Sequence, residues 1–459
     1  MRQTEASPRR LAFDAAFRIM IVLLILWAIL PTYFTKISSG LDPSWIYAVN
    51  IAGSMGYKFG ADPFFRYGPL GFLGSCVAVA GNAAIYFWFY GILVALVAYL
   101  LFKAIVLSKR CSLTGAAISA ALLCCAAPID ADYFVSSVIL LAVSLAWFED
   151  EKRLHFAVAC ALTAVSAFIK FSGSVLALSA IASFVLFRLI RDRRQGLRFL
   201  YLFLLVPVLV AAGYLAYNPS FSGLKGYVLA AIDISSGYNS AMSLPPPAGV
   251  LALAAACAVG YGVGMALVFR ADRNQGMYLL VFCGAFFMAF KHGFVRADHA
   301  PIFFKAVLLW NGIFALFLDF GALHAFFRAR KALAAVLAAA ILMQVSLPIY
   351  YLHAQGWTPF GVFQNKIGEI AGGIPDKLAS PRMGGGNRLP DEFLAEIGDA
   401  TVAVYPAQQS IGAYNDVRFV FMPVIQAYSA YTPRLDKLNA AFFGFSSNAP
   451  EYVVFDLGT

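Results

Sequence analysis

The chain alternates long apolar runs with short polar connections over most of its length. About eleven runs approach the roughly 20 apolar residues that an α-helix needs to cross a bilayer. They lie at residues 17–35, 83–102, 112–129, 133–148, 154–170, 172–190, 199–217, 248–269, 276–290, 301–319 and 332–351. The pattern predicts an all-α polytopic membrane protein, with a transmembrane domain over residues 1–351.

The connections differ in charge on alternate sides of the predicted membrane. Basic residues recur in every second connection, as in "RLIRDRRQGLR" (188–198), "RADR" (270–273) and "RARK" (328–331). Such connections usually face the cytoplasm. An odd number of spans then places the N-terminus in the cytoplasm and the C-terminus outside. The first apolar run is followed by no small-x-small cleavage site, so an uncleaved signal anchor is expected.

The first outer loop, residues 36–82, is long and amphipathic. It contains two Asp-Pro pairs, and each is typical of the start of a short helix lying in the membrane interface, because Asp caps helices and Pro suits the first turn. These pairs are Asp42-Pro43 and Asp62-Pro63. The second pair belongs to "YKFGADPFFRYGPLGF" (57–72), whose aromatics, Tyr67 among them, suit the headgroup level.

The C-terminal hundred residues change in character. Residues 352–390 are a Gly/Pro-rich linker, and residues 391–459 alternate short β-like runs with helical patterns. Thr432 before Pro433 reads as a helix cap followed by proline in the first turn. We expect a small extracytoplasmic α/β domain that docks on the membrane part, because about 70 residues bury little core by themselves.

Composition excludes several classes of function. Of the 459 residues, 61% are apolar and only 13% are charged. The net charge of +10 comes from loops between spans, where basic residues orient the protein, so no nucleic-acid partner is expected. Six of the seven cysteines lie in or at the edge of apolar runs, which gives no disulfide framework or metal spacing. Phosphate-binding glycine loops, nucleophile elbows and HExxH are missing, so no ATP-driven motor is expected.

Most unusual polar residues lie at the outer ends of the predicted spans. "KHGFVRADHAP" (291–301) carries Lys291, Arg296, Asp298 and His299 on the side where topology disfavours positive charge. Lys and Arg at a membrane boundary suit a phosphate, which Arg can hold through two hydrogen bonds. The alternative is a solvated turn whose cations reach toward water.

Other outer positions are weaker candidates. Lys170 lies between two apolar runs, where it either pairs, faces a polar cavity or reaches outward. Tyr238, in the outer loop 218–247, can line a sugar or lipid pocket. Asp130 and Asp132 have the spacing by which two carboxylates share a divalent cation, Mg²⁺ or Mn²⁺, on a diphosphate, or else they cap a helix.

Together these features resemble the GT-C superfamily of membrane glycosyltransferases. The likeness rests on the many spans, the long first outer loop with an acid in "SSGLDPSW", and the segments "FFRYGPLGF", "FVRADH" and "QAYSAYTPRLDKLNA". "FFRYGPLGF" is similar to a segment of the branch of protein mannosyltransferases and aminoarabinose transferases. The first loop departs from better-known branches, since it has Asp-Pro in place of an acidic doublet or DxD.

The resemblance implies transfer of a hexose or pentose from a polyprenyl-phosphate donor to a glycan, lipid or protein acceptor in a bacterial inner membrane. Asp42 would be the general base, with Asp62 as the second candidate. Cations would hold the donor phosphate, and further residues would line the substrate site. The expected phosphate-binding residues are Arg296, Lys291 and Arg66; the expected substrate-binding residues are Asp298, His299, Lys170, Tyr238 and Tyr67. A monophosphate donor needs no metal, whereas a diphosphate donor would involve Asp130 and Asp132.

Two other readings remain open. One is a transporter or flippase for a lipid-linked or other anionic substrate, which should show polar groups at both membrane faces and an internal repeat. The other is a non-catalytic scaffold of an envelope-assembly complex, with the C-terminal domain as its docking surface.

Overall fold

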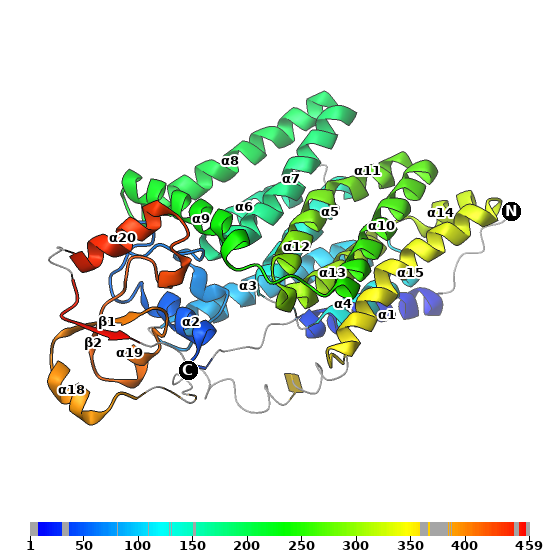
Figure 1. The fold of residues 1–459 in the computed structure, drawn as a ribbon. Coiled ribbons are helices and arrows are strands. Elements are labelled where there is room, and N and C mark those ends of the chain that lie inside the picture. Colours follow the sequence, from blue (N-terminus) through cyan, green and yellow to red (C-terminus); the bar gives the residue numbers. More distant parts are fainter. Residues whose placement is uncertain are drawn as a thin grey trace.

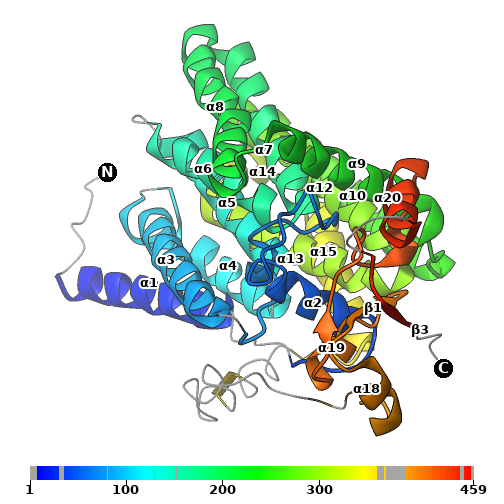
Figure 2. The same cartoon turned by 90° about the vertical axis from the view of Figure 1, so that its left-hand side faces the viewer.

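A computed structural model describes residues 8–29, 36–79, 81–108, 110–127, 129, 131–149, 153–358, 366–367, 384, 386, 388–444 and 449–455. The protein is a bundle of long helices with a small mixed domain, the cap, at one end (Figure 1). Turning the molecule brings the cap in front of the bundle (Figure 2). Most of the predicted linker 352–390 lies outside the described residues.

Eight of the described helical segments are long and apolar enough to cross a membrane, and three apolar helices are shorter. The prediction of a helical membrane protein is thereby confirmed, whereas the number of eleven spans stays a prediction. The bundle helices are α1 (Pro8–Ile29), α3 (Asn82–Phe102), α4 (Leu113–Ala126), α5 (Ala131–Glu149), α6 (Leu154–Ile169), α7 (Phe171–Arg191), α8 (Arg193–Tyr217), α10 (Ala248–Ala271), α11 (Arg273–Val281), α12 (Cys283–Val295), α13 (Ala300–Phe317), α14 (Phe320–Arg328) and α15 (Lys331–Ala354).

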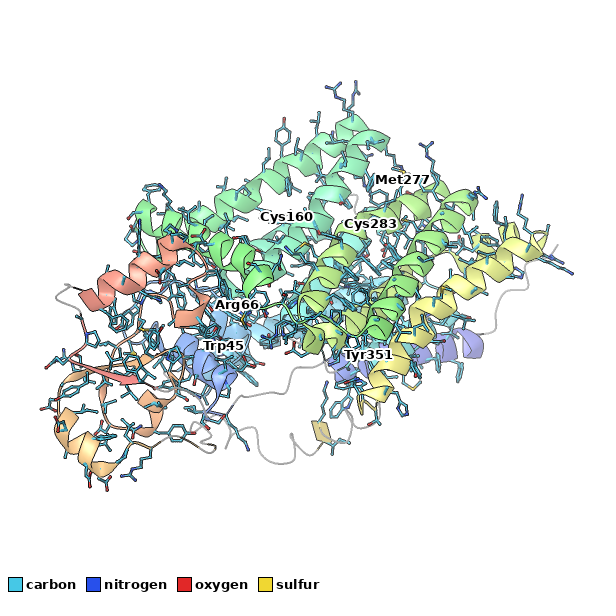
Figure 3. The ribbon with its side chains drawn as sticks, in the orientation of Figure 1. Trp45, Arg66, Cys160, Met277, Cys283 and Tyr351 are labelled. Atoms are coloured by element: carbon cyan, nitrogen blue, oxygen red, sulfur yellow. The ribbon has the colours of Figure 1, made fainter. Side chains whose placement is uncertain are left out.

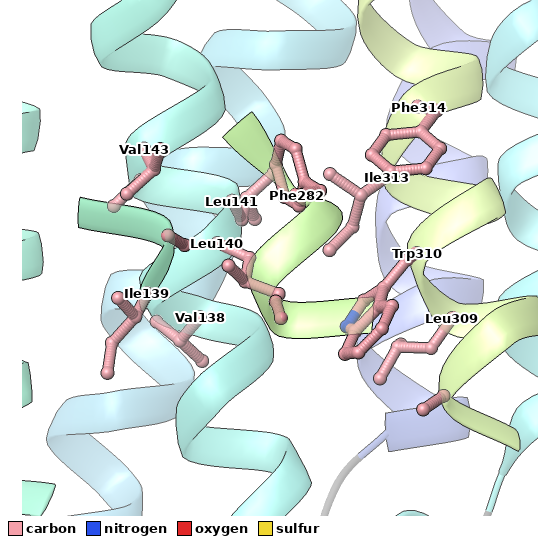
Figure 4. Close-up of a cluster of buried hydrophobic side chains, with 14 of the residues drawn as sticks. Val138, Ile139, Leu140, Leu141, Val143, Phe282, Leu309, Trp310, Ile313 and Phe314 are labelled. Atoms are coloured by element: carbon pink, nitrogen blue, oxygen red, sulfur yellow. The ribbon is translucent and has the colours of Figure 1, made fainter. Parts of the chain in front are cut away.

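Helices α5 and α13 form the centre of the bundle. Their side chains pack with Phe282, between α11 and α12, in a buried apolar cluster that includes Leu140 and Trp310, each at most 1% exposed (Figure 4). Helices α4 and α13 approach closely because Gly115 of α4 faces the backbone carbonyl of Ala315. Small residues at such contacts allow the dense packing that holds membrane helices together.

The first outer loop contains one α-helix, α2 (Leu41–Ile51), and a short 3-10 helix, η1 (Gly71–Leu73). The helix expected at Asp42-Pro43 is therefore present, but the one expected at Asp62-Pro63 is wrong. Gly60, at φ +90°, turns the chain there, and its amide donates to the carbonyl of Pro63. The chain then continues extended, because the Phe64 amide donates to Pro423 of the cap.

Helix α9 (Phe221–Ala241) occupies a stretch that the sequence reading leaves as a loop. Ser220 caps it by accepting a hydrogen bond from the amide of Gly223. The buried positions recur every three or four residues, which is the helical period, and they face the first outer loop and the cap. They are Gly223, Tyr227, Ala230, Ala231 and Ile234. That periodicity was the signal in the sequence for this helix.

The cap contains a small parallel sheet with strand order β2-β1-β3. Its strands and longer helices lie where the sequence pattern predicts them. Strand β2 has only two residues, and both pair with β1. Thr432 caps α20 as expected, since its hydroxyl accepts from the Leu435 amide. The elements are α18 (Asp391–Ile397), β1 (Thr401–Tyr405), α19 (Ile411–Tyr414), β2 (Arg418–Phe419), η4 (Ala427–Ser429), α20 (Pro433–Gly444) and β3 (Tyr452–Phe455).

The cap docks on α2, α9 and the first outer loop. Ser44 of α2 shares hydrogen bonds with Gln408 and Ser410 of the cap. On the other side, Arg434 of α20 forms an ion pair with Asp233 of α9 at 2.7 Å. These contacts fix the cap over the end of the bundle where the predicted outer loops gather.

Candidate functional site

A cavity of about 240 Å³ lies beneath the cap, among the ends of α5, α7, α9 and α12. We call it the cationic cavity. Its lining residues are Arg66, Tyr133, Ser136, Lys170, Phe171, Ser172, Gly173, Val175, Leu176, Ile234, Ser235, Tyr238, Asn239, Met288, Lys291, His292 and Val295. The lining contains three basic side chains, Arg66, Lys170 and Lys291, and none of these described residues is Asp or Glu. The remaining wall is mostly apolar, which suits an anion with a hydrocarbon tail.

Lys170 reaches the cavity because the chain breaks between two helices at this residue. Helix α6 ends at Ile169 and α7 begins at Phe171, with Lys170 extended between them. The first outer loop pairs with this break. The Phe171 amide donates to the backbone carbonyl of Arg66, and Tyr67 forms an antiparallel bridge with Lys170. The break therefore brings two of the predicted cations, Lys170 and Arg66, to the same wall.

Arg66 extends from the first outer loop at the cap end of the bundle, next to Trp45 (Figure 3). Its guanidinium lies 5.6–5.9 Å from the ring centres of four aromatic side chains, which attract a cation through their faces. These are Trp45, Phe65, Tyr67 and Tyr238. The rings of Trp45 and Tyr67 stack at 4.6 Å, so the Arg66 side chain rests on a rigid support.

Two histidines connect this cavity to a second one. The hydroxyl of Tyr133 lies 3.0 Å from Nδ1 of His292, and the His292 ring meets the His299 ring edge to face at 5.5 Å. His292 lines the cationic cavity, whereas His299 lines the neighbouring cavity. The predicted substrate residue His299 therefore contacts His292, which lines the cationic cavity, while His299 itself lines the neighbouring one.

The neighbouring cavity, the cap cavity, has a volume of about 100 Å³ and lies between the bundle and the cap. Its lining residues are Leu41, Asp42, Phe65, Arg66, Ile234, Tyr238, Met242, Arg296, Asp298, His299, Gln426, Tyr428, Ser429 and Tyr431. Arg66, Ile234 and Tyr238 line both cavities and so form the partition between them.

Asp42 stands in the first turn of α2, on the wall of the cap cavity. Its Oδ1 accepts a hydrogen bond of 2.8 Å from Nε1 of Trp45, and its side chain caps no helix amide. The indole therefore fixes the carboxylate in orientation. Within the described part of the chain, Trp45 is the one hydrogen-bond donor to this carboxylate, which leaves Oδ2 to accept a proton.

Arg296 and Asp298 form an ion pair with two hydrogen bonds on the wall of the cap cavity. Nε and Nη2 of Arg296 each donate to one carboxylate oxygen of Asp298 at 3.0 Å. The hydrogen bond to Asp298 raises the pKa of Arg296 above its usual value, against the opposing effect of burial. The pair offers a donor and an acceptor side by side, which suits hydroxyl groups of a sugar better than a phosphate alone.

Two predicted site residues, Asp62 and Tyr67, line neither cavity. Asp62 is exposed on its turn, where it accepts from the Lys58 amide, and it lines neither cavity. Tyr67 is buried behind Arg66 and supports that side chain instead of lining a cavity. Asp130 and the side chain of Asp132 lie outside the described residues. Among the residues that the structure does describe, no group of three or more His, Cys, Asp or Glu side chains can hold a metal ion.

Sequence reasoning missed the contribution of the cap to the site. Tyr428 and Tyr431 line the cap cavity from a segment more than 350 residues after Asp42. Burial raises the pKa of the Tyr428 hydroxyl above its usual value, although nearby Arg66 has a lowering effect. This phenol therefore stays protonated and able to donate. The signal in the sequence was the aromatic "QAYSAYTP" between a strand and a helix.

Comparisons of the chain with models of protein families, with curated proteins and with solved structures found no match.

Proposed function

We propose that the protein is a membrane glycosyltransferase that moves a sugar from a polyprenyl-phosphate donor to an acceptor under the cap. The observation that carries the proposal is the pair of adjoining cavities. One is cationic and largely apolar, the other holds the fixed carboxylate of Asp42, and Arg66 and Tyr238 line both. A donor phosphate in the first cavity and an acceptor base in the second would thus lie on either side of this shared wall.

The cationic cavity supports the donor half of the proposal. Lys170, Lys291 and Arg66 supply positive charge for a phosphate monoester or diester. Apolar side chains of α7, α9 and α12 complete the wall, in contact range of a prenyl chain. Because negative charge grows on the phosphate as the glycosidic bond breaks, these cations stabilise the transition state more than the ground state.

The cap cavity supports the acceptor half. An acceptor hydroxyl would attack the anomeric carbon of the sugar while its proton passes to Oδ2 of Asp42. The bond between the anomeric carbon and the phosphate oxygen breaks, and polyprenyl phosphate leaves with the electron pair. Arg296, Asp298 and the cap tyrosines would bind sugar hydroxyls. In this account Arg296 contacts the sugar or acceptor, and Lys170 replaces it at the phosphate.

The proposal uses a monophosphate donor, whose charge the three cations can balance. It places the protein in a bacterial inner membrane with the N-terminus in the cytoplasm and the cap outside. The acceptor is a glycan, a lipid or a protein. Membership of the GT-C superfamily, which the sequence features resemble, is part of what we propose.

The experiment uses synthetic undecaprenyl-phosphate sugars, each with a radiolabelled hexose or pentose, in membranes that contain the full-length protein. We expect label to leave one of these lipids in the presence of wild-type protein. Asp42→Asn should reduce the rate by about 10²-fold or more, the effect of losing a general base, while binding of undecaprenyl phosphate is kept. Asp62→Asn is the matched control and should leave the rate unchanged.

Equal rates for Asp42→Asn and wild type would contradict the catalytic role of Asp42. A transporter would instead move the intact labelled lipid between leaflets in both variants. A scaffold would bind no undecaprenyl phosphate at all.

A further inference from the structure

A third cavity, of about 510 Å³, lies at the opposite end of the helices that line the cationic cavity. We call it the arginine cavity. Its charged lining residues are Arg110, Arg153, Arg188, Arg191, Arg198 and Glu149. Five guanidinium groups and one carboxylate therefore line one concave surface, where low-dielectric walls strengthen the field that attracts an anion.

The two sites are separated by the length of one membrane-spanning helix. Helix α7 begins at the cationic cavity with Phe171 and ends at the arginine cavity with Arg191. Its 21 residues rise by about 30 Å, the thickness of the hydrocarbon core of a bilayer. Helix α5 spans the same interval, from Tyr133 to Glu149. The end of α7 that carries the arginine cavity points away from the cap (Figure 1), so in a membrane that α7 crosses this cavity would lie at the headgroup level of the leaflet opposite to the cap.

Two of the arginines contact carbonyls and rings of the bundle. Nη2 of Arg188 donates to the carbonyl of Ala146 at 3.0 Å and its guanidinium lies 4.8 Å from the Trp147 ring centre. Arg110 lies over the Phe148 ring at 4.7 Å. These contacts orient the two guanidinium groups at the wall of the cavity.

Nearby carboxylates serve as helix caps. Asp192 accepts from the backbone amides of Arg194 and Gln195 at the start of α8. Asp272 does the same for α11. Burial would raise the pKa of Asp272, but hydrogen bonds from Gln275 and Asn274, together with the charge of Arg110, lower it below its usual value. Among the residues that the structure describes, Glu149 is the acid that lines the cavity.

Apolar side chains continue from the arginines onto the outside of the bundle. On α7, Leu186 is 54% and Ile190 is 64% exposed, and on α8 Tyr201 is 68% exposed. In a membrane these faces contact acyl chains. A phosphate in the arginine cavity can therefore belong to a lipid whose tails lie on α7 and α8. Basic pockets between helices at the headgroup level suit anionic lipid headgroups.

We propose that the arginine cavity binds the phosphate of an anionic phospholipid from the leaflet opposite to the cap. The site goes beyond the proposed sugar transfer and does not depend on it. Orienting the protein in the membrane requires positive charge on this face but no concave site. Arg193 and Arg194, exposed on the first turn of α8 and outside the lining, meet that requirement and serve as controls.

The test measures thermal unfolding of the full-length protein in neutral detergent with dioleoylphosphatidylglycerol, dioleoylphosphatidylcholine or inorganic pyrophosphate. We expect a saturable rise in Tm with phosphatidylglycerol and a smaller rise with phosphatidylcholine. The double variant Arg191→Gln/Arg198→Gln should need about tenfold more phosphatidylglycerol for half of the effect, because charge-assisted hydrogen bonds to phosphate are lost. The control Arg193→Gln/Arg194→Gln removes the same charge and should behave as wild type.

Equal losses in the two double variants would overturn the proposal, since net charge and not the cavity would then bind the lipid. A rise in Tm with pyrophosphate alone would overturn the assignment to a lipid and indicate a soluble phosphate ligand. Arg198→Gln alone, which changes one exposed residue, gives the same comparison if the double variant does not fold. Lys291→Gln, in the cationic cavity, should leave this response unchanged, so the site is tested separately from the donor site.

Discussion

Lys170 shows how one residue connects sequence, fold and site. A lysine between two apolar runs must pair, face a polar cavity or reach water. The structure gives it a helix break, a bridge to Tyr67 and a place on the wall of the cationic cavity. The sequence shows the charge of Lys170. The segment that pairs with the helix break lies in a loop about 100 residues earlier in the chain, which the local pattern does not indicate.

The first prediction concerns the cations of this cavity. Lys170→Gln and Lys291→Gln should each weaken binding of undecaprenyl phosphate about tenfold, because each removes a charged donor from a phosphate in a largely apolar site. Equilibrium binding to the purified full-length protein in detergent measures this. Lys225→Gln, an exposed lysine of α9 outside both linings, is the control and should bind as wild type. Equal weakening in all three variants would show that only net charge matters.

Asp42 could be named from the sequence, but its surroundings could not. The acid follows the first apolar run, and the resemblance to membrane glycosyltransferases implied that it acts as a base. Its hydrogen bond from Trp45 follows from helical spacing, since the two residues lie three apart. The cap tyrosines that close the cavity over it are brought there by tertiary docking, which local patterns do not encode.

At the scale of elements, periodicity predicted the bundle helices and the longer cap elements. The Asp62-Pro63 helix was wrong because Gly60 turns the chain and the cap pairs with Phe64. Helix α9 was missed because its mixed composition suggested a loop, although its buried face follows the helical period. In both cases a tertiary contact decided between two local conformations that the sequence permits.

The second prediction concerns the contact between α9 and the first outer loop. Gly226 of α9 packs against the carbonyl of Gly60, so an added Cβ would lie 2.1 Å from that oxygen. Gly226→Ala should therefore lower the stability by about 1–3 kcal/mol and lower Tm. Gly262→Ala is the control, because nothing lies within 4 Å of its added Cβ in α10. It should keep or raise Tm, and the reverse order would contradict the packing of α9.

The third prediction concerns how α20 of the cap is held on α9. Asp233→Arg should lower Tm and loosen the cap, because it places two guanidinium groups together where an ion pair of 2.7 Å now stands. The exchange Asp233→Arg/Arg434→Asp should restore most of the loss, because the pair is re-formed with reversed sign. Protease sensitivity of the cap is the measurement. An exchange variant as sensitive as the single variant would show that the pair does not hold the cap.

At the scale of the whole molecule, two anion-attracting cavities lie at opposite ends of a bundle about as long as a bilayer is thick. Between them the centre of the bundle is packed, with Leu140, Val143 and Ile181 fully buried. The sequence shows which connections are basic. It does not show that five arginines from separate connections and helix ends meet in one cavity. That arrangement depends on how α5, α6, α7 and α8 pack.

The fourth prediction concerns orientation. Glu392→Cys places a thiol on an exposed position of the cap, and Arg193→Cys places one at the other end of the bundle. A membrane-impermeant maleimide added to intact cells, with the outer membrane permeabilised where there is one, should label the first variant and leave the second at the level of wild type. Both should be labelled after lysis. Labelling of Arg193→Cys in intact cells would reverse the orientation on which the proposed site of transfer rests.

The most direct measurement is a photoreactive undecaprenyl phosphate, crosslinked to the purified full-length protein and mapped by mass spectrometry. We expect labels within residues 170–176, 234–239 and 288–295, the segments that contribute most of the lining of the cationic cavity. Unlabelled undecaprenyl phosphate should compete for these labels, whereas uncharged undecaprenol should not, and Lys170→Gln should reduce them. Labels spread over the lipid-facing helices, with equal competition by undecaprenol, would contradict a donor site in this cavity.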